Sequence, residues 1–234
     1  MQTAKSAGLY LKQMEVGPMA NFIYLVGDAA KKEVLLVDPA WQIDTVFKAA
    51  EKENLKITGA LVTHCHFDHC NGLDELLAKK HIPVYVNAEE ADFSKSVADR
   101  TDSLFGTFPE SNLRKVHSGD KIKAGDVEIT LIHTPGHTPG SQCFLVDNNL
   151  ISGDTLFVRG CGRCDLPGGD PEKMYESLTQ KLLKLPDDTV LYPGHFYGND
   201  PVSDLKTEKT KNPYMICGNL ETFLKLAGGR RYEA

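Results

Sequence analysis

The stretch Thr63 to Cys70, THCHFDHC, places three imidazoles, one carboxylate and two thiols within eight residues. It follows the short apolar segment Ala60 to Val62, which has the pattern of a strand, and it precedes a leucine-marked segment with helical spacing. Groups that are costly to desolvate do not gather in a stable fold unless they are paired or bound to a metal. The stretch therefore predicts a metal site where a buried strand turns into a helix.

Residues of the same kind stand at three later strand ends. They are His137 in HTPGHTPGS, Asp154 in ISGDTLF and His195 in LYPGHFYG, each just after an apolar segment. Glycine beside each one lets the backbone bend closely around an ion, and the preceding strand holds the ligand rigidly. These three residues are therefore further candidate ligands.

The spacing within THCHFDHC suggests a division of its ligands. His64 and His66 are two residues apart, so both project to the same side of an extended segment. Asp68 and His69 lie where the chain turns into the helix, and they can face a different point. A single tetrahedral zinc takes four ligands, and this run alone offers four at an awkwardly close spacing. Spacing alone leaves both arrangements open.

The remaining histidines and cysteines carry weaker signals. For His81, His117 and His133 we favour surface or core roles, since each stands alone. Cys161 and Cys164 form a CxxC pair outside any thioredoxin-like context, and we favour ordinary partly buried thiols over a redox or zinc role. A chain of 234 residues with a good core does not need disulfides, so none is expected.

The hydrophobic pattern predicts an α+β fold. In each half of the chain, strand-like runs are followed by a helical run, namely 43–53 in the first half and 171–185 in the second. The segment 89–113 is polar and irregular, and it reads as a helix and loop over the site. Two sheets packed face to face, with helices on their outer faces, is the economical arrangement. Because no flexible linker separates the halves, residues 1–234 are predicted to form a single domain.

Composition excludes several classes of function. The net charge is −6 and the charged residues are mixed along the chain, which argues against binding to nucleic acid. No apolar run approaches the length of about 18 residues that a membrane span requires. The first residues lack the apolar core of a signal peptide, so a cytoplasmic location is expected. The oligomeric state is not predicted.

Taken together, THCHFDH, HTPGHTPGS, SGDTLF and YPGHFYG resemble the metallo-β-lactamase family in its glyoxalase II branch. The resemblance extends from about Ala20 to Met215 and implies an αββα sandwich. It also implies two metal sites that share one aspartate. The first site would use His64, His66 and His137, the second would use Asp68, His69 and His195, and Asp154 would bridge the two.

The resemblance further implies a thioester hydrolase like the short bacterial relatives of glyoxalase II, acting on S-acylglutathione-type substrates. A hydroxide shared by two divalent ions would be the nucleophile, with Asp68 also accepting a proton. Zinc is the expected metal, and iron and manganese suit the same donors. Arg163 and Tyr197 match positions that contact glutathione in the larger enzymes, and an arginine suits a carboxylate of the tripeptide. A structural salt bridge is the alternative role for Arg163.

A second reading comes from RGCGRCD, Arg159 to Asp165, which resembles a run in the persulfide dioxygenases. Those enzymes use one iron on two histidines and one carboxylate, here His64, His137 and Asp154. Cys164 stands where that family has threonine, which weakens the match. Because the dioxygenases keep most of the other ligand residues, the ligand set does not decide between the two readings. A ligand sensor without activity is disfavoured because every ligand position is filled.

Overall fold

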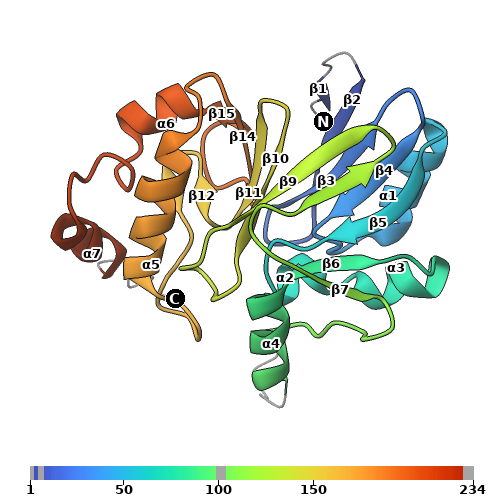
Figure 1. The fold of residues 1–234 in the computed structure, drawn as a ribbon, viewed down its shortest axis with the longest axis horizontal. Helices are drawn as coiled ribbons and strands as arrows, with labels where there is room; N and C mark the ends of the chain where they lie inside the picture. The colour runs from blue at the N-terminus through green and yellow to red at the C-terminus, as the bar shows by residue number, and fades with distance from the viewer. Residues whose placement is uncertain (1–2, 5–7, 99–103, 229–234) are drawn as a thin grey trace.

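Two β-sheets pack face to face, and helices cover the outer face of each (Figure 1). The structure is a computed structural model, and it describes residues 3–4, 8–98 and 104–228. The predicted α+β sandwich of the αββα type is confirmed. No helix among these residues is long and apolar enough to cross a membrane.

The first sheet contains seven strands in chain order. They are β1 (Thr3–Ala4), β2 (Leu9–Val16), β3 (Asn21–Asp28), β4 (Glu33–Val37), β5 (Lys56–Leu61), β6 (Val84–Asn87) and β7 (Leu113–Val116). Strands β1 to β4 are antiparallel, whereas β4 to β7 are parallel. Parallel neighbours need crossover connections, which here contain α1 (Ile43–Lys52), α2 (Phe67–Cys70), α3 (Leu73–Lys79) and α4 (Ala88–Ser96).

The second sheet contains six strands in the order β15-β14-β11-β10-β9-β8. Their bounds are β8 (Lys121–Ala124), β9 (Val127–His133), β10 (Gln142–Val146), β11 (Asn149–Gly153), β14 (Val190–Pro193) and β15 (Ser203–Asp204). A separate hairpin joins β12 (Leu156–Phe157) to β13 (Gly160–Cys161). The helices of this half are α5 (Pro171–Glu176), α6 (Leu205–Lys211) and α7 (Leu220–Gly228).

Burial on both faces explains the continuous apolar runs of the first sheet. Along β3, Tyr24 and Val26 pack between the two sheets, whereas Ile23 and Leu25 pack against the helices on the outer side. Successive side chains of a strand point to opposite faces, so a strand buried on both faces has to be apolar throughout. A third cluster lies between the second sheet and its helices. The core therefore fills all three spaces of the four-layer sandwich.

The structure also differs from the expected elements in places. The helical run 171–185 is α-helical only to Glu176, and it continues as a π-helical turn, Ser177–Lys181, and a 3-10 turn, Leu182–Lys184. Strand β7 was not expected, and it begins at Leu113, the last residue of the segment 89–113 that was expected to be a helix and loop. Its middle residues, Arg114 and Lys115, are exposed, so the segment lacks a continuous apolar pattern.

The sequence pattern also did not predict the hairpin β12–β13, strand β15 or helix α6. The strands have two residues each, too few to show a period. Only Leu205 and Glu208 of α6 are buried, so this helix shows almost no apolar stripe. Short or mostly exposed elements are therefore the ones that the pattern did not predict.

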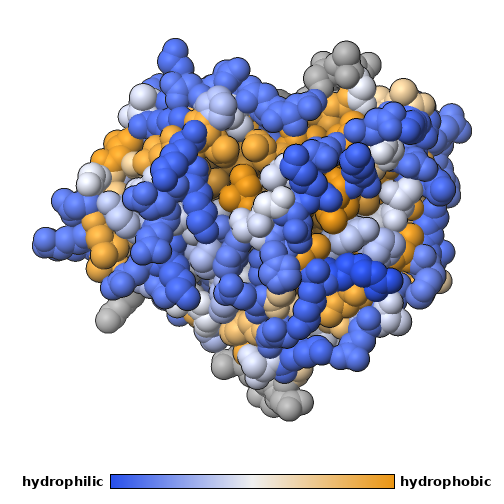
Figure 2. Space-filling view, viewed as in Figure 1, coloured by the Kyte–Doolittle hydropathy of each residue, from blue (hydrophilic) through white to orange (hydrophobic). Residues whose placement is uncertain are grey.

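Hydrophilic residues cover most of the face seen in Figure 2, including the outer helices, and hydrophobic residues gather toward its middle, where the two sheets meet.

Candidate metal centre

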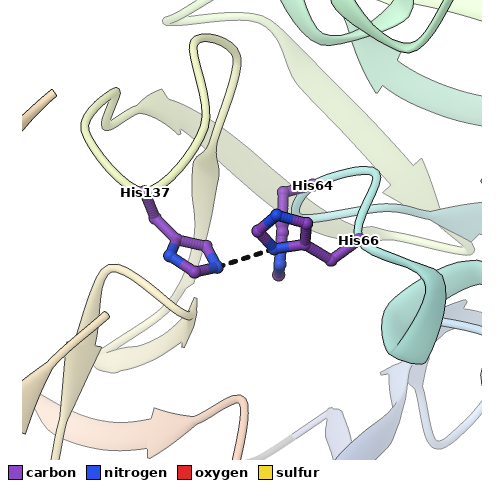
Figure 3. A group of neighbouring side chains, drawn as sticks. All are labelled: His64, His66 and His137. Carbon is purple, nitrogen blue, oxygen red and sulfur yellow. Dashed lines mark hydrogen bonds between the residues drawn. The ribbon is translucent and has the colours of Figure 1, made fainter. Parts of the chain in front are cut away.

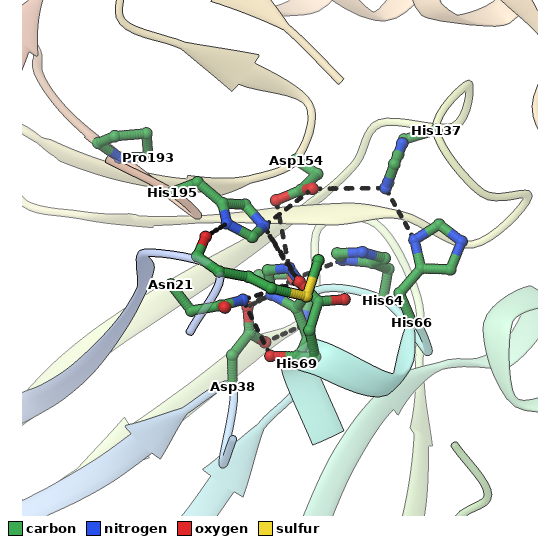
Figure 4. A network of polar contacts seen from close by, with 12 residues as sticks. Asn21, Asp38, His64, His66, His69, His137, Asp154, Pro193 and His195 are labelled. Carbon is green, nitrogen blue, oxygen red and sulfur yellow. Dashed lines mark hydrogen bonds and ion pairs between the residues drawn. The ribbon is translucent and has the colours of Figure 1, made fainter. Parts of the chain in front are cut away.

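Loops that follow strands of both sheets bring the seven predicted ligand residues together, and Figure 4 labels all of them except Asp68. The segment 62–69 follows β5 and enters α2, and the other ligands follow β9, β11 and β14. Six of the seven are at most 9% exposed, and the side chain of Asp68 is 14% exposed. Strand ends of two sheets therefore converge on one buried cluster of imidazoles and carboxylates.

A first donor group consists of His64, His66 and His137 (Figure 3). One nitrogen from each ring lies within 4.8 Å of the others. The closest pair is His66 Nδ1 and His137 Nε2, at 2.9 Å. Three imidazoles with this convergence can serve as ligands of one ion.

A second donor group consists of Asp68, His69 and His195, also within 4.8 Å. The Nε2 atoms of the two histidines are 3.1 Å apart, and Asp68 Oδ2 lies 3.2 Å from His195 Nε2. Residues 64 and 66 thus belong to one group, and residues 68 and 69 to the other. His64, His69 and Asp154 form a further group within 4.8 Å, so the two donor groups adjoin each other. These distances accommodate the divided arrangement of the opening stretch.

Asp154 lies between the two groups. Its Oδ2 is 3.5 Å from His137 Nε2 and 3.4 Å from His195 Nε2, and its Oδ1 is 3.4 Å from His69 Nε2. An added Cβ at Gly194 would lie 2.4 Å from Asp154 Oδ1, so a larger residue there would clash with this carboxylate. The glycine before His195 therefore leaves room for a carboxylate that contacts both groups.

Hydrogen bonds on the outer side of three rings fix their orientation. His137 Nδ1 bonds to the carbonyl oxygen of Arg163 at 2.7 Å, and His195 Nδ1 bonds to that of Met19 at 2.9 Å. His69 Nδ1 bonds to Asp38 Oδ2 at 2.9 Å. Because carbonyl and carboxylate oxygens accept, each Nδ1 donates and each Nε2 points to the centre, where it can bind an ion once it carries no proton.

Two buried residues that sequence analysis missed support the second group. Asp38 Oδ1 accepts from the backbone of Thr63, and its Oδ2 accepts from the Thr63 hydroxyl and from His69. Asn21 Nδ2 donates to Asp68 Oδ2 at 2.9 Å. Their only signal in the sequence is that each lies at the end of a strand, Asn21 beginning β3 and Asp38 following β4.

A third missed residue, Glu90 of α4, joins the loops of the first group and is fully buried. Its Oε1 accepts from the backbone of Cys65 at 2.6 Å, between two ligands. Its Oε2 accepts from the Thr138 hydroxyl at 2.7 Å and from the backbone of Gly140 at 2.8 Å. An added Cβ at Gly140 would lie 2.1 Å from the backbone nitrogen of Glu90. Glu90 thus ties the loop of His64 and His66 to the loop of His137.

The two donor groups differ in their protonation. Burial lowers the pKa of His64 well below its usual value, and burial together with the charge on His137 lowers the pKa of His66 to about 3. At His195 burial acts in the same direction, but the charge on Asp154 outweighs it and raises the pKa to about 9. For Asp154 burial raises the pKa, but the charges on His195 and His69 dominate and hold it well below its usual range.

The donor atoms fit divalent metal ions. Among the described residues, His64 Nε2 and Asp154 Oδ1 are buried atoms without a hydrogen-bond partner. The Nε2 atoms of His69 and His195 face each other, and both Nδ1 atoms donate outward. A proton or a cation is therefore needed between the two Nε2 atoms. Imidazole and carboxylate are the ligands that zinc, iron and manganese accept. The described residues therefore form a metal-binding site.

A cavity of about 900 Å³ opens over this centre. Its lining includes His66, Asp68, His137, Asp154 and His195, so both donor groups are accessible from it. The volume lies within the range of small-molecule sites. A substrate in this cavity would therefore reach both groups.

Both predicted substrate-binding residues line this cavity. Arg163 also forms a two-bond salt bridge with Asp165, with Nε to Oδ1 and Nη2 to Oδ2 both at 2.9 Å. Tyr197 is 58% exposed and stacks on His195, with ring centroids 4.4 Å apart. Arg163 thus forms the salt bridge that was its alternative role, and it also lines the cavity.

The other histidines and the cysteines lie outside the donor groups. His81 lies near Asn112, His117 is exposed, and His133 lies against the carbonyl oxygen of Pro139. The cysteines of the described residues form no disulfide. Cys65 and Cys70 are buried beside the ligands, and the thiol of Cys70 donates to the backbone carbonyls of Cys65 and His66.

Cys161 and Cys164 pack in the core cluster beneath the helices of the second half. In the described residues neither belongs to a group that could hold a metal. Cys161 also lines the cavity.

Comparisons with known proteins agree with this geometry. The profile of the Metallo-beta-lactamase superfamily matches residues 16–195. The probable polyketide biosynthesis zinc-dependent hydrolase BaeB of Bacillus velezensis is 31% identical over 205 residues, covering 88% of this chain and 86% of that protein. The human mitochondrial persulfide dioxygenase ETHE1 is 32% identical over 227 residues, covering 95% and 82%.

The fold of this chain also resembles that of a solved structure. The crystal structure of ETHE1 from Myxococcus xanthus superimposes with a TM-score of 0.82 at 29% identity, covering 94% of this chain and 91% of that one. The superfamily profile spans most of the chain, and the fold is the one that the motifs predicted. The chain therefore belongs to the metallo-beta-lactamase superfamily.

Proposed function

We propose that this protein is a metal-dependent hydrolase that cleaves thioesters of the S-acylglutathione type with two divalent metal ions. The observation that carries the proposal is the second donor group. It is as closely assembled as the first, and Asp154 lies between the two. A mononuclear enzyme of the 2-His-1-carboxylate type would need only His64, His137 and Asp154.

Ions held by these groups would lower the pKa of water to near neutrality and polarise the substrate carbonyl. His64, His66 and His137 would hold one ion, Asp68, His69 and His195 the other, and Asp154 would contact both. Zinc is the metal we propose, since the donors are imidazole and carboxylate in a buried site. Asn21 orients the carboxylate of Asp68, which we assign as the proton acceptor during attack.

Arg163 and Tyr197 would bind the thiol portion of the substrate. Asp165 holds the guanidinium of Arg163 at the cavity wall, so little conformational entropy would be lost when it binds a carboxylate. Tyr197 is held by stacking on His195. Both residues are thus positioned before a substrate arrives.

The second candidate function is a mononuclear iron dioxygenase that oxidises a persulfide. It is favoured by the likeness to ETHE1. It is also favoured by the cavity position of residues from the run 159–165. His64, His137 and Asp154 would then hold the iron, and the second donor group would hold none.

Metal analysis and two assays on one sample separate these candidates. The metal content of the purified protein is measured, and the protein is then tested with S-lactoylglutathione and with glutathione persulfide. We expect two ions per chain and release of free thiol from the thioester. One iron per chain with oxygen consumption on the persulfide would favour the dioxygenase. Metal-replete protein that leaves thioesters intact would contradict the hydrolase.

A further inference from the structure

Exposed hydrophobic side chains concentrate around the mouth of the cavity. Seven large hydrophobic side chains of the described residues are more than a third exposed, and five of them line the cavity. These five, which we call the apolar rim, are Met19, Phe67, Leu104, Phe196 and Tyr197, at 37–58% exposure. The other two, Ile216 and Leu226, do not line it. Such a gathering of exposed apolar surface marks a binding site.

The aromatic residues of the apolar rim are supported by further rings. Phe67 packs edge-on against Trp41, with centroids 6.1 Å apart. Phe196 packs against Phe22 at 5.6 Å. Tyr197 contacts Phe157 edge-on at 5.4 Å, in addition to its stacking on His195. These contacts hold apolar surface in place at the mouth without burying it, so a ligand that covers it loses little entropy.

The positive charges of the cavity come from a different segment. Arg159 and Arg163 both belong to the loop around the hairpin β12–β13, and the apolar rim contains no charged residue. Arg159 has φ +61 and is anchored to the fully buried Glu208 through its backbone nitrogen and through its guanidinium, whose Nε lies 3.5 Å from Oε1. The acidic residues of the lining, Asp68 and Asp154, belong to the metal centre. The cavity thus offers an apolar surface and a separate cationic one.

We infer that the substrate carries an apolar acyl chain longer than a lactoyl group, which packs along Met19, Phe67, Leu104 and Phe196 of the apolar rim, and an anionic thiol portion, which lies between Tyr197 and the two arginines, Arg159 and Arg163. This inference rests on the proposed thioesterase activity and names its substrate class. Hydrolysis breaks the C–S bond, forms a C–O bond to the oxygen of water and releases a carboxylate and a thiol. The carboxylate product keeps the acyl chain.

A chain-length series tests the inference on the metal-loaded protein. S-acetyl-, S-butanoyl-, S-hexanoyl- and S-octanoylglutathione are compared with S-lactoylglutathione. Because each buried methylene contributes to binding, kcat/KM is expected to rise about two- to fourfold per methylene up to hexanoyl. A flat or falling series, with S-lactoylglutathione hydrolysed, overturns this inference and leaves the proposed function intact. If no thioester is cleaved, both fail.

Uncleavable ligands provide a test that does not depend on turnover. S-hexylglutathione is expected to bind at least about tenfold more tightly than S-methylglutathione in calorimetry. Equal affinities would overturn the inference even if thioesters are hydrolysed.

Substitutions in the apolar rim localise the effect. Met19→Ser and Leu104→Ser should each reduce the dependence of kcat/KM and of affinity on chain length. Ile216→Ser is the matched control, because Ile216 is equally exposed but lies outside the cavity. All three side chains are at least 40% exposed, so these changes should affect folding little. An unaltered dependence in both rim variants, or the same loss in Ile216→Ser, would contradict the assignment.

Discussion

The two donor groups of the metal centre lie side by side and differ in chemistry. The first consists of three imidazoles, and at least His64 and His66 are neutral in the metal-free protein at neutral pH. In the second, His195 has a raised pKa because it faces the carboxylates of Asp154 and Asp68. An ion entering the first group meets neutral rings at His64 and His66, whereas an ion entering the second has to displace a proton from His195.

The groups are also supported by different buried carboxylates. Glu90 bonds to the loops that carry the first group, and Asp38 bonds to His69 of the second. Support around metal ligands sets the orientation of the rings and hence the affinity for the ion. We therefore expect that the metal affinities of the two donor groups can be altered separately.

The largest effect is expected where the two groups meet. Asp154→Asn keeps the shape of the side chain but removes the charge that contacts both groups. Metal content should fall at both, and kcat/KM for the thioester should drop about thousandfold or more, because the ions supply several kcal/mol of transition-state stabilisation. Asp126→Asn, an exposed acid, is the control. Loss of one ion only would show that Asp154 serves a single site.

Substitution of each supporting carboxylate should weaken metal binding at one donor group more than at the other. Glu90→Gln should weaken metal binding at the first group, and Asp38→Asn at the second, each by about 10- to 100-fold. In each variant an amide NH₂ replaces an oxygen that accepts hydrogen bonds. Stepwise titration against a chelator measures the two affinities. If both variants weaken both steps equally, the carboxylates act on the fold as a whole rather than on separate groups.

The pH dependence of metal binding sharpens the same contrast. The pKa of His195 is raised to about 9, so below that pH a proton occupies this ring in the metal-free protein and has to leave before an ion binds. Affinity at the second group should therefore fall as pH drops from 9 toward 6. His66, whose pKa is lowered to about 3, stays neutral over this range.

Calorimetry in buffers of different ionisation enthalpy counts the protons released at each step. We expect release at the second step and little at the first. Equal proton release at both steps would contradict the expected difference in protonation between the two donor groups.

The smallest effect is expected at a thiol inside THCHFDHC. Cys70 donates to two backbone carbonyls and lies outside both donor groups. Cys70→Ala should leave the metal stoichiometry at two and lower the free energy of unfolding by about 1 kcal/mol, since only a small buried group is lost. Thermal unfolding and metal analysis of the same sample measure both quantities. A missing ion in this variant would make the thiol part of the centre.

Much of the fold and the centre could be predicted from the sequence because local patterns carry them. Strands buried on both faces are apolar throughout, as in β3 and β4. The candidate ligands cluster in one short run or stand beside glycine at strand ends, as His137 and His195 do. Glu90 could not be predicted, because an acidic residue near the start of a helix usually faces solvent.

The sequence by itself determined which donor groups the chain carries and that each follows a buried strand. Only the tertiary structure decided which atoms meet, because the partners are far apart in the chain. His66 and His137 are separated by 71 residues, His69 and His195 by 126, and Glu90 and Gly140 by 50. The apolar rim likewise joins separate loops. Packing of the two sheets brings these segments together, and no local pattern encodes that contact.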